Sequence, residues 1–158
     1  MNARAGQGVR PASAAQSGML AELRPTVRPG VFVYCRWPHG LDVPFHEVVA
    51  AIRGDVGLTV VIGEARARRS GLVPLFRCRW ISLGPKPALD RVGVTATIAA
   101  ALAEAGIPCN VMAALDGDQL FIPVRYVTRA MLRVQAIVRA AQALDPGPAT
   151  LCGAGKPP

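Results

Sequence analysis

The chain has 158 residues and a formal net charge of +8, and 51% of its residues are hydrophobic while only 5% are aromatic. This length suits one compact domain or two small half-domains with a shared core, and it excludes a large multidomain enzyme. No apolar run approaches the roughly 20 residues that span a bilayer, so we expect no membrane segment. The 18 Lys and Arg residues are scattered, which favours a solvated basic surface over a dedicated nucleic-acid patch.

The four cysteines stand at positions 35, 78, 109 and 152, and no two of them form a CxxC pair. This spacing predicts reduced thiols in a cytoplasmic protein. His39 lies four residues from Cys35, but neither has a second ligand nearby in sequence, so we expect no metal site. No glycine-rich loop of the phosphate-binding type occurs either, and we expect no cofactor.

Two segments read as disordered tails. Residues 1–17 are small and polar without periodicity, and residues 145–158 are crowded with Pro and Gly. Residues 18–144 between them are the predicted folded unit.

The first half of this unit alternates strands and short helices. Residues 31–37 (VFVYCRW), 58–63 (LTVVIG) and 75–83 (LFRCRWISL) are rich in β-branched and aromatic residues, which predicts strands. Residues 45–53 (FHEVVAAIR) predict a short helix, and the polar stretch 64–71 (EARARRSG) predicts another that stops at its glycine.

The second half contains two amphipathic helices around a hairpin. A helix is predicted over residues 91–105, with an apolar stripe at helical spacing. Residues 109–115 (CNVMAAL) and 118–124 (DQLFIPV) flank Asp116-Gly117, a strong two-residue hairpin signal. The last predicted helix covers residues 125–142. Its apolar face stands opposite four arginines, Arg125, Arg129, Arg133 and Arg139.

The second half thus reads strand, helix, strand, strand, helix, and lacks the final strand of a ferredoxin-like βαββαβ unit. The natural donor is the N-terminal segment, where residues 31–37 have no local partner. We therefore predict an α+β fold with two interlocked half-domains, residues 18–83 and 84–144, which share one sheet.

Residues 89–111 (LDRVGVTATIAAALAEAGIPCNV) carry a family resemblance. A strand, a short loop, a glycine in the first helical turn and an Ala-rich helix that ends at Gly106-Ile107 resemble the start of an ACT domain, a small-molecule-sensing module. Its Asp-x-x-Gly pattern is matched by Asp90 and Gly93. Over residues 19–140 the chain is similar to small stand-alone tandem-ACT proteins of uncharacterised function. The resemblance implies two ACT-like half-domains, an amino-acid ligand and a homodimer.

The chain departs from that family pattern at two places. Pro87 and Ala88 stand where the family has two serines, and the hairpin reads Gly117, Asp118, Gln119 where the family has His-Asp-His. Two hypotheses follow, a retained ligand site and a lost one.

The first turn of the predicted helix is the candidate ligand site. Unpaired N–H groups and the helix dipole attract a carboxylate there, and Gly93 has no Cβ to block a close approach. The alternative for Gly93 is that the missing Cβ only lets the helix pack closely on a strand. Asp90 is either the cap of the helix or the partner of a ligand amino group. Asn110 is the first residue of the next strand and lies beside the loop. The alternative to a ligand contact is that its side chain makes its hydrogen bonds within the protein at the end of the strand. The candidate residues are Leu89, Asp90, Val92, Gly93, Val94, Thr95 and Asn110.

We expect a binding protein rather than an enzyme, because neither His39 nor His46 has a Ser, Cys or carboxylate set that forms a triad. RNA-binding RRM domains share the βαββαβ order, but they stack bases on aromatics of the central strands. The two predicted hairpin strands, which correspond to those central strands, contain one aromatic residue, Phe121. The prediction is a sensor for a small amino-acid-like ligand; the alternatives are a ligand-free interaction module and a nonspecific nucleic-acid binder that uses the arginine face.

Overall fold

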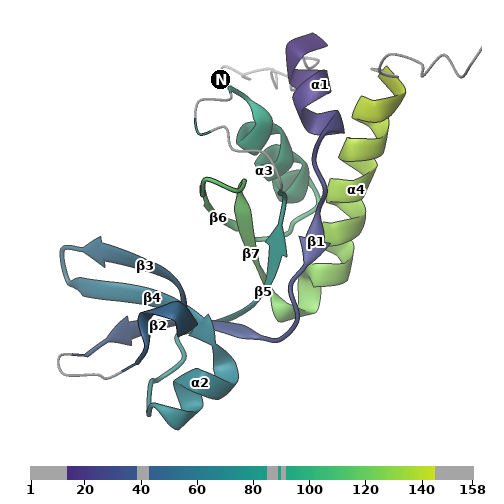
Figure 1. Cartoon of the computed structure of the whole chain (residues 1–158). Helices are drawn as coiled ribbons and strands as arrows, with labels where there is room; N and C mark the ends of the chain where they lie inside the picture. Colours follow the sequence, from purple (N-terminus) through teal and green to yellow (C-terminus); the bar gives the residue numbers. More distant parts are fainter. Residues whose placement is uncertain (1–13, 39–42, 85–88, 90–91, 145–158) are drawn as a thin grey trace, which may run out of the picture.

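The computed structural model describes residues 14–38, 43–84, 89 and 92–144 (Figure 1). The helices are α1 (Ala14–Ala21), α2 (Glu64–Arg69), α3 (Val94–Glu104) and α4 (Val127–Leu144), with 3-10 turns η1 (Phe45–Glu47) and η2 (Val124–Tyr126). The strands are β1 (Thr26–Val27), β2 (Phe32–Trp37), β3 (Val48–Gly54), β4 (Gly57–Gly63), β5 (Phe76–Ser82), β6 (Asn110–Met112) and β7 (Gln119–Pro123).

All seven strands described belong to one antiparallel sheet, in the order β3-β4-β2-β5-β7-β6, with β1 beside β5. The fold is α+β and ferredoxin-like, as predicted. Strand β5 joins the two halves: Phe76 to Cys78 pair with β2, whereas Ile81 and Ser82 pair with β1. One strand therefore serves both halves, which is the physical form of the predicted interlocking.

The N-terminal segment does supply the strand missing from the second half, but not with the predicted residues. Strand β1, Thr26–Val27, lies beside β5 and completes the group β1-β5-β7-β6. The strand predicted over residues 31–37 is present as β2, Phe32–Trp37, but it pairs within its own half, with β4 and β5. The predicted boundary between the two half-domains, between residues 83 and 84, remains a proposal.

The helix predicted over residues 45–53 is wrong. Only Phe45–Glu47 turn, as η1, and Val48–Gly54 form strand β3, which pairs along β4. Gly54 pairs with Gly57 across a tight turn, and Gly57 takes a φ of 119°, a value that glycine adopts at little cost. Residues 48–54 are a strand because they pair with β4. Their periodicity alone does not distinguish a short strand from a short helix.

Three helix starts also differ from the predictions. Helix α1 begins at Ala14, inside the predicted tail, and it packs on α3 and α4 (Figure 1). Helix α3 begins at Val94 instead of residue 91. Arg125 lies in η2, ahead of α4, although it is exposed like the other three arginines of the predicted face.

The helices cover one face of the sheet. Residues paired across an antiparallel ladder share a face, and the pairs link Val33 with Arg77 and Ile81 with Leu120. Ile81 and Leu120 belong to the core cluster that α1, α3 and α4 cover, and Val33 to the cluster beneath α2. A third cluster lies on the opposite face, where it gathers five aromatic residues: Phe32, Tyr34, Phe76, Trp80 and Phe121.

An ion pair fastens α2 to β5. The Arg77 guanidinium donates from Nε and Nη2 to the two carboxylate oxygens of Glu64, at 2.6 and 3.1 Å. The hydrogen bond from Arg77 lowers the pKa of Glu64 below its ordinary value. Among the helices of the described ranges, none has the length and apolar character needed to cross a membrane.

Candidate functional site

Gly93 is the residue immediately before helix α3, and its backbone is left-handed, with φ 92° and ψ −14°. A side chain in this conformation costs roughly 1–2 kcal/mol, so glycine is the residue that fits. A Cβ built at Gly93 would also lie 2.5 Å from Nε2 of Gln16, which belongs to α1. The glycine therefore allows the close packing of one helix on the end of another.

The Gln16 side chain holds α1 against the first turn of α3. Its Nε2 donates to the Gly93 carbonyl at 3.0 Å and to Oγ1 of Thr97 at 2.8 Å. The Thr97 hydroxyl donates to the same carbonyl at 2.9 Å. The space directly above Gly93, which the sequence indicated for a ligand or partner subunit, is thus occupied by the chain's own N-terminal helix.

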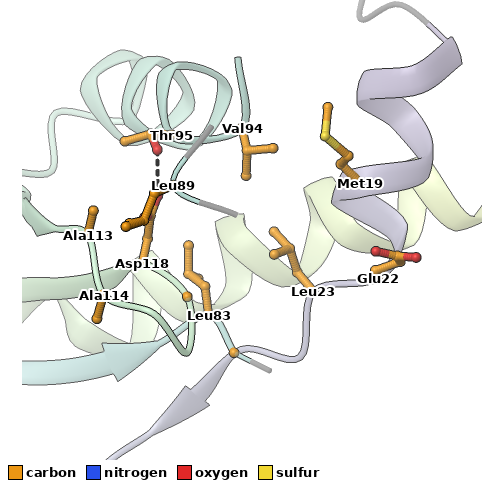
Figure 2. Close-up of a pocket in the computed structure, with 12 residues that line it drawn as sticks. Met19, Glu22, Leu23, Leu83, Leu89, Val94, Thr95, Ala113, Ala114 and Asp118 are labelled. Atoms are coloured by element: carbon orange, nitrogen blue, oxygen red, sulfur yellow. Dashed lines mark hydrogen bonds between the residues drawn. The ribbon is translucent and has the colours of Figure 1, made fainter. Parts of the chain in front are cut away.

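A pocket of about 100 Å³ lies beside this contact (Figure 2). It is bounded by α1, the end of β5, the first turn of α3 and the β6–β7 hairpin. Drug-sized ligands occupy pockets of roughly 300–1,000 Å³, so this one suits a much smaller molecule. The lining residues are Met19, Glu22, Leu23, Leu83, Gly84, Leu89, Val94, Thr95, Ala113, Ala114, Gly117 and Asp118.

Two carboxylates belong to the lining, Asp118 from the hairpin and Glu22 from the turn that follows α1 (Figure 2). The Thr95 hydroxyl donates to Oδ2 of Asp118, which orients that carboxylate beside the helix N-terminus. The backbone N–H of Leu83 donates to the Asp118 carbonyl at 3.0 Å, so the hairpin is tied to the end of β5. These two hydrogen bonds hold the hairpin wall of the pocket to α3 and to the end of β5.

The hairpin also approaches β5 closely at Gly117. A Cβ there would lie 3.2 Å from the backbone of Gly84, and Gly117 has a φ of 104°. Glycine at this position lets the two backbone segments form adjacent walls of the pocket.

The predicted site residues divide into three groups. Leu89, Val94 and Thr95 line the pocket, and Gly93 lies next to them under Gln16. Val92 is 85% exposed and lies outside the lining.

Asn110 is exposed at the start of β6, whereas the residues of that segment that line the pocket, Ala113 and Ala114, follow its other end. Asp90 lies outside the described residues, as do Pro87 and Ala88. The helix-cap alternative for Asp90 is not supported, because the residue immediately before α3 is Gly93.

The sequence prediction missed the pocket residues from α1 and from the hairpin. Met19, Glu22 and Leu23 lay within the predicted folded unit but were assigned no element, so nothing brought them to the site. Asp118 carried a signal, since it matches the acidic residue at the centre of the family's His-Asp-His hairpin.

The strands considered for base stacking were also not the central ones. The centre of the sheet is β2 and β5, which carry four of the five clustered aromatics. Tyr34 packs edge-on against Phe76 and Phe121, with ring centroids 5.5 and 5.7 Å apart, and Phe32 against Trp80 at 5.3 Å. Rings packed against one another in this way form a core cluster and are not a row of separate platforms for bases.

The chain belongs to the ACT-domain family and carries two ACT-type domains in tandem. One family model described as ACT domain matches residues 17–79, and a second with the same description matches residues 76–132. The two matches overlap at the start of β5, the strand that both halves share.

Solved structures with the same fold include three bacterial proteins. A protein of unknown function from Vibrio cholerae, described as a possible transport protein, has 26% identity and a TM-score of 0.68, covering 80% of this chain and 99% of that one. A protein from Agrobacterium tumefaciens has 17% identity and a TM-score of 0.56, covering 73% of this chain and 89% of that one. The regulatory subunit of aspartate kinase from Thermus thermophilus, in a ligand-free form, has 14% identity and a TM-score of 0.55, and the match covers 73% of this chain and 98% of that one. No curated protein matches the chain by sequence.

Proposed function

We propose that this protein is a regulatory ACT protein that binds a small amino-acid-like molecule without transforming it. The observation that carries the proposal is the pocket at the N-terminus of α3, where the Asp118 carboxylate lies beside the first helical turn. The two ACT-domain matches support the same role.

The chemistry of the pocket suits a molecule that has both an amino and a carboxylate group. The first N–H groups of a helix have no partner within it and favour an anion, which fits a ligand carboxylate. The Asp118 carboxylate, oriented by Thr95, is placed to accept hydrogen bonds from a ligand ammonium group. Leu83 and Leu89 supply apolar contacts, and the small volume limits the ligand to a short side chain.

The same role implies a homodimer in the cytoplasm, since family members often place effectors at subunit interfaces. Three cysteines of the described residues, Cys35, Cys78 and Cys109, are free thiols, which agrees with a reducing compartment. Among the described residues no group of three or more His, Cys, Asp or Glu could hold a metal ion. Sedimentation equilibrium of the purified chain tests the dimer.

The ligand is tested by thermal unfolding of the purified protein against each proteinogenic amino acid at millimolar concentration. A ligand at about 100 times its Kd adds roughly 2.7 kcal/mol, which raises the midpoint by several degrees. Asp118→Asn removes the oriented charge and should weaken binding at least tenfold, the loss expected for one charge-assisted hydrogen bond. Asp116→Asn is the matched control, because Asp116 is on the same hairpin but outside this pocket.

A selective midpoint shift that Asp118→Asn weakens and Asp116→Asn leaves unchanged supports the proposal. The absence of a shift with every amino acid would contradict it and favour the hypothesis of a lost ligand site, in which the protein acts as an interaction module. A shift that both variants retain would place the ligand elsewhere.

A further inference from the structure

Helix α1 closes the pocket at α3 on one side. It lies beside α3 and α4, at the end of the molecule away from the β3–β4 hairpin (Figure 1). Three of the lining residues, Met19, Glu22 and Leu23, belong to α1 or to the turn that follows it (Figure 2). The rest of the lining comes from the end of β5, from the segment that leads into α3 and its first turn, and from the β6–β7 hairpin. The pocket therefore loses one wall when α1 leaves its place.

Helix α1 depends on its neighbours for its fold. It has eight residues, fewer than the roughly 12–15 that make an isolated helix even marginally stable in water. Leu20 is 3% exposed and belongs to the core cluster that also contains Val94 of α3. Ser17 is buried as well. Packing of these side chains keeps α1 helical, so undocking and unfolding of α1 should occur together.

Hydrogen bonds hold α1 at both ends. Toward its C-terminus, the Ala21 carbonyl accepts from Nε2 of Gln142 at 3.0 Å, in an exposed position. Toward its N-terminus, Gln16 donates to the Gly93 carbonyl and to Thr97 in a partly buried position. The Gln16 bonds reach the start of α3, whose first turn lines the pocket. Gln16 is therefore the side chain that ties α1 to the candidate site.

Binding in the pocket and docking of α1 are linked through this shared wall. A ligand that contacts the α1 side chains binds the docked form more tightly than a form in which that wall is missing. By reciprocity, the same coupling free energy favours docked α1 when the ligand is bound. The N-terminal helix thus changes its degree of order with the occupancy of the pocket.

We propose that α1 is a lid on this pocket and that Gln16 is the positioning residue that holds the lid closed. The inference rests on the proposed function, since the coupling requires a ligand at α3. Occupancy of the pocket shifts α1 toward its docked form, so α1 is the element that carries the regulatory signal out of the site.

Opening of the lid is measured by labelling a thiol placed on α1. Ser17→Cys introduces this thiol at a buried position of the helix that is outside the pocket lining, so a bound ligand does not shield it directly. Its rate of reaction with iodoacetamide reports how often α1 undocks. Cys78 is fully buried in the cluster on the opposite face of the sheet and is the internal reference for wider unfolding. Peptide mapping by mass spectrometry gives both rates from one sample.

The first arm needs no ligand. In the Ser17→Cys protein, Gln16→Ala should speed labelling of the introduced thiol about tenfold, because it removes the hydrogen bonds to α3. The rate at Cys78 should stay the same, which a loss of global stability would not allow. Gln135→Ala is the matched control, since this α4 side chain makes no hydrogen bond with the described residues. It should change neither rate.

The second arm uses glycine and L-alanine as probes, because the pocket of about 100 Å³ favours the shortest side chains. At about ten times its Kd, a probe that binds only the docked form should slow labelling of the introduced thiol about tenfold. The Kd of that probe should be at least about threefold weaker in Gln16→Ala, since part of its binding free energy is then used to close the lid.

Three results would overturn the proposal: a labelling rate on α1 that Gln16→Ala leaves unchanged, an equal acceleration at Cys78, or no slowing by either probe. The thermal panel of amino acids separates this failure from that of the proposed function. A midpoint shift there, without protection of α1, would leave the ligand site in place and refute the lid. No shift with any amino acid would refute both, even where Gln16→Ala speeds labelling.

Discussion

Replacing Gly93 by alanine tests whether α1 and α3 depend on each other at this one position. The new Cβ would meet Nε2 of Gln16 at 2.5 Å and Cδ at 3.0 Å, so the Gln16 side chain has to move. It would then lose its hydrogen bonds to the Gly93 carbonyl and to Thr97. The alanine would also keep a backbone φ of 92°, which is strained for any residue with a Cβ.

The expected loss is the sum of these two effects. The left-handed backbone costs alanine about 1–2 kcal/mol. The two hydrogen bonds contribute about 1 kcal/mol each, part of which is recovered when water replaces them. We therefore expect Gly93→Ala to lower the free energy of unfolding by about 2–3 kcal/mol.

The assay is urea unfolding followed by circular dichroism, with Gly63→Ala as the control. Gly63 also precedes a helix, α2, but its φ is −59° and no atom lies within 4 Å of a built Cβ. Its replacement should cost no more than about 1 kcal/mol, the usual difference at such a position. In a Gln16→Ala background, Gly93→Ala should cost only the strain, because the clash and the lost bonds are already absent.

Equal destabilisation by Gly93→Ala and Gly63→Ala would refute this reasoning. A cost of Gly93→Ala that is unchanged by Gln16→Ala would refute the contact with α1 while leaving the backbone strain in place.

Three further predictions follow from burial and charge. Leu102 is fully buried in α3, so Leu102→Ala should lower the free energy of unfolding by about 3 kcal/mol in the same urea assay. Leu132 is 57% exposed on α4, and Leu132→Ala should lower it by less than about 0.5 kcal/mol. Because the pKa of the ion-paired Glu64 is lowered by folding, its stabilising effect should be present above its ordinary value of 4.5 and disappear as the carboxyl is protonated at lower pH. The gap in urea midpoint between wild type and Glu64→Gln should therefore close from neutral pH to about pH 3, and a constant gap would contradict the assignment. Burial raises the pKa of Cys78 to about 12 and of Cys109 to about 11, so both should react with a thiol reagent at neutral pH at least about tenfold faster in denaturing urea than in the folded protein. Peptide mapping by mass spectrometry distinguishes the two, and equal labelling rates would argue against their burial.

Local patterns in the sequence were enough to predict most of the elements. The apolar spacing of Val94, Ile98 and Leu102 predicts α3, and all three residues are buried in the structure. Asp116-Gly117 predicts the β6–β7 hairpin, and the two strands do pair, but the last pair is Met112 with Gln119, so the turn is longer than the predicted two residues. These features depend on residues a few positions apart, where helical or strand periodicity and turn geometry act directly.

The same local patterns failed where the outcome depended on distant residues. Residues 48–54 form a strand because β4 lies beside them, and the predicted helix has no such partner. The special position of Gly93 was visible in the sequence, but its cause was not: Gln16, 77 residues away, packs against it. Nothing local in the chain encodes that contact.

The candidate site shows the same division. Leu89, Val94 and Thr95 could be named from their place at the start of a predicted helix, because helix N-termini have a general affinity for anions. The other walls come from α1 and from the hairpin at Asp118, which are far apart in sequence and meet only because β1 and β7 lie on opposite edges of β5. The sequence by itself determined the helical turn that could bind a ligand, and only the tertiary structure decided which side chains enclose it, since enclosure depends on packing between elements that share no local signal.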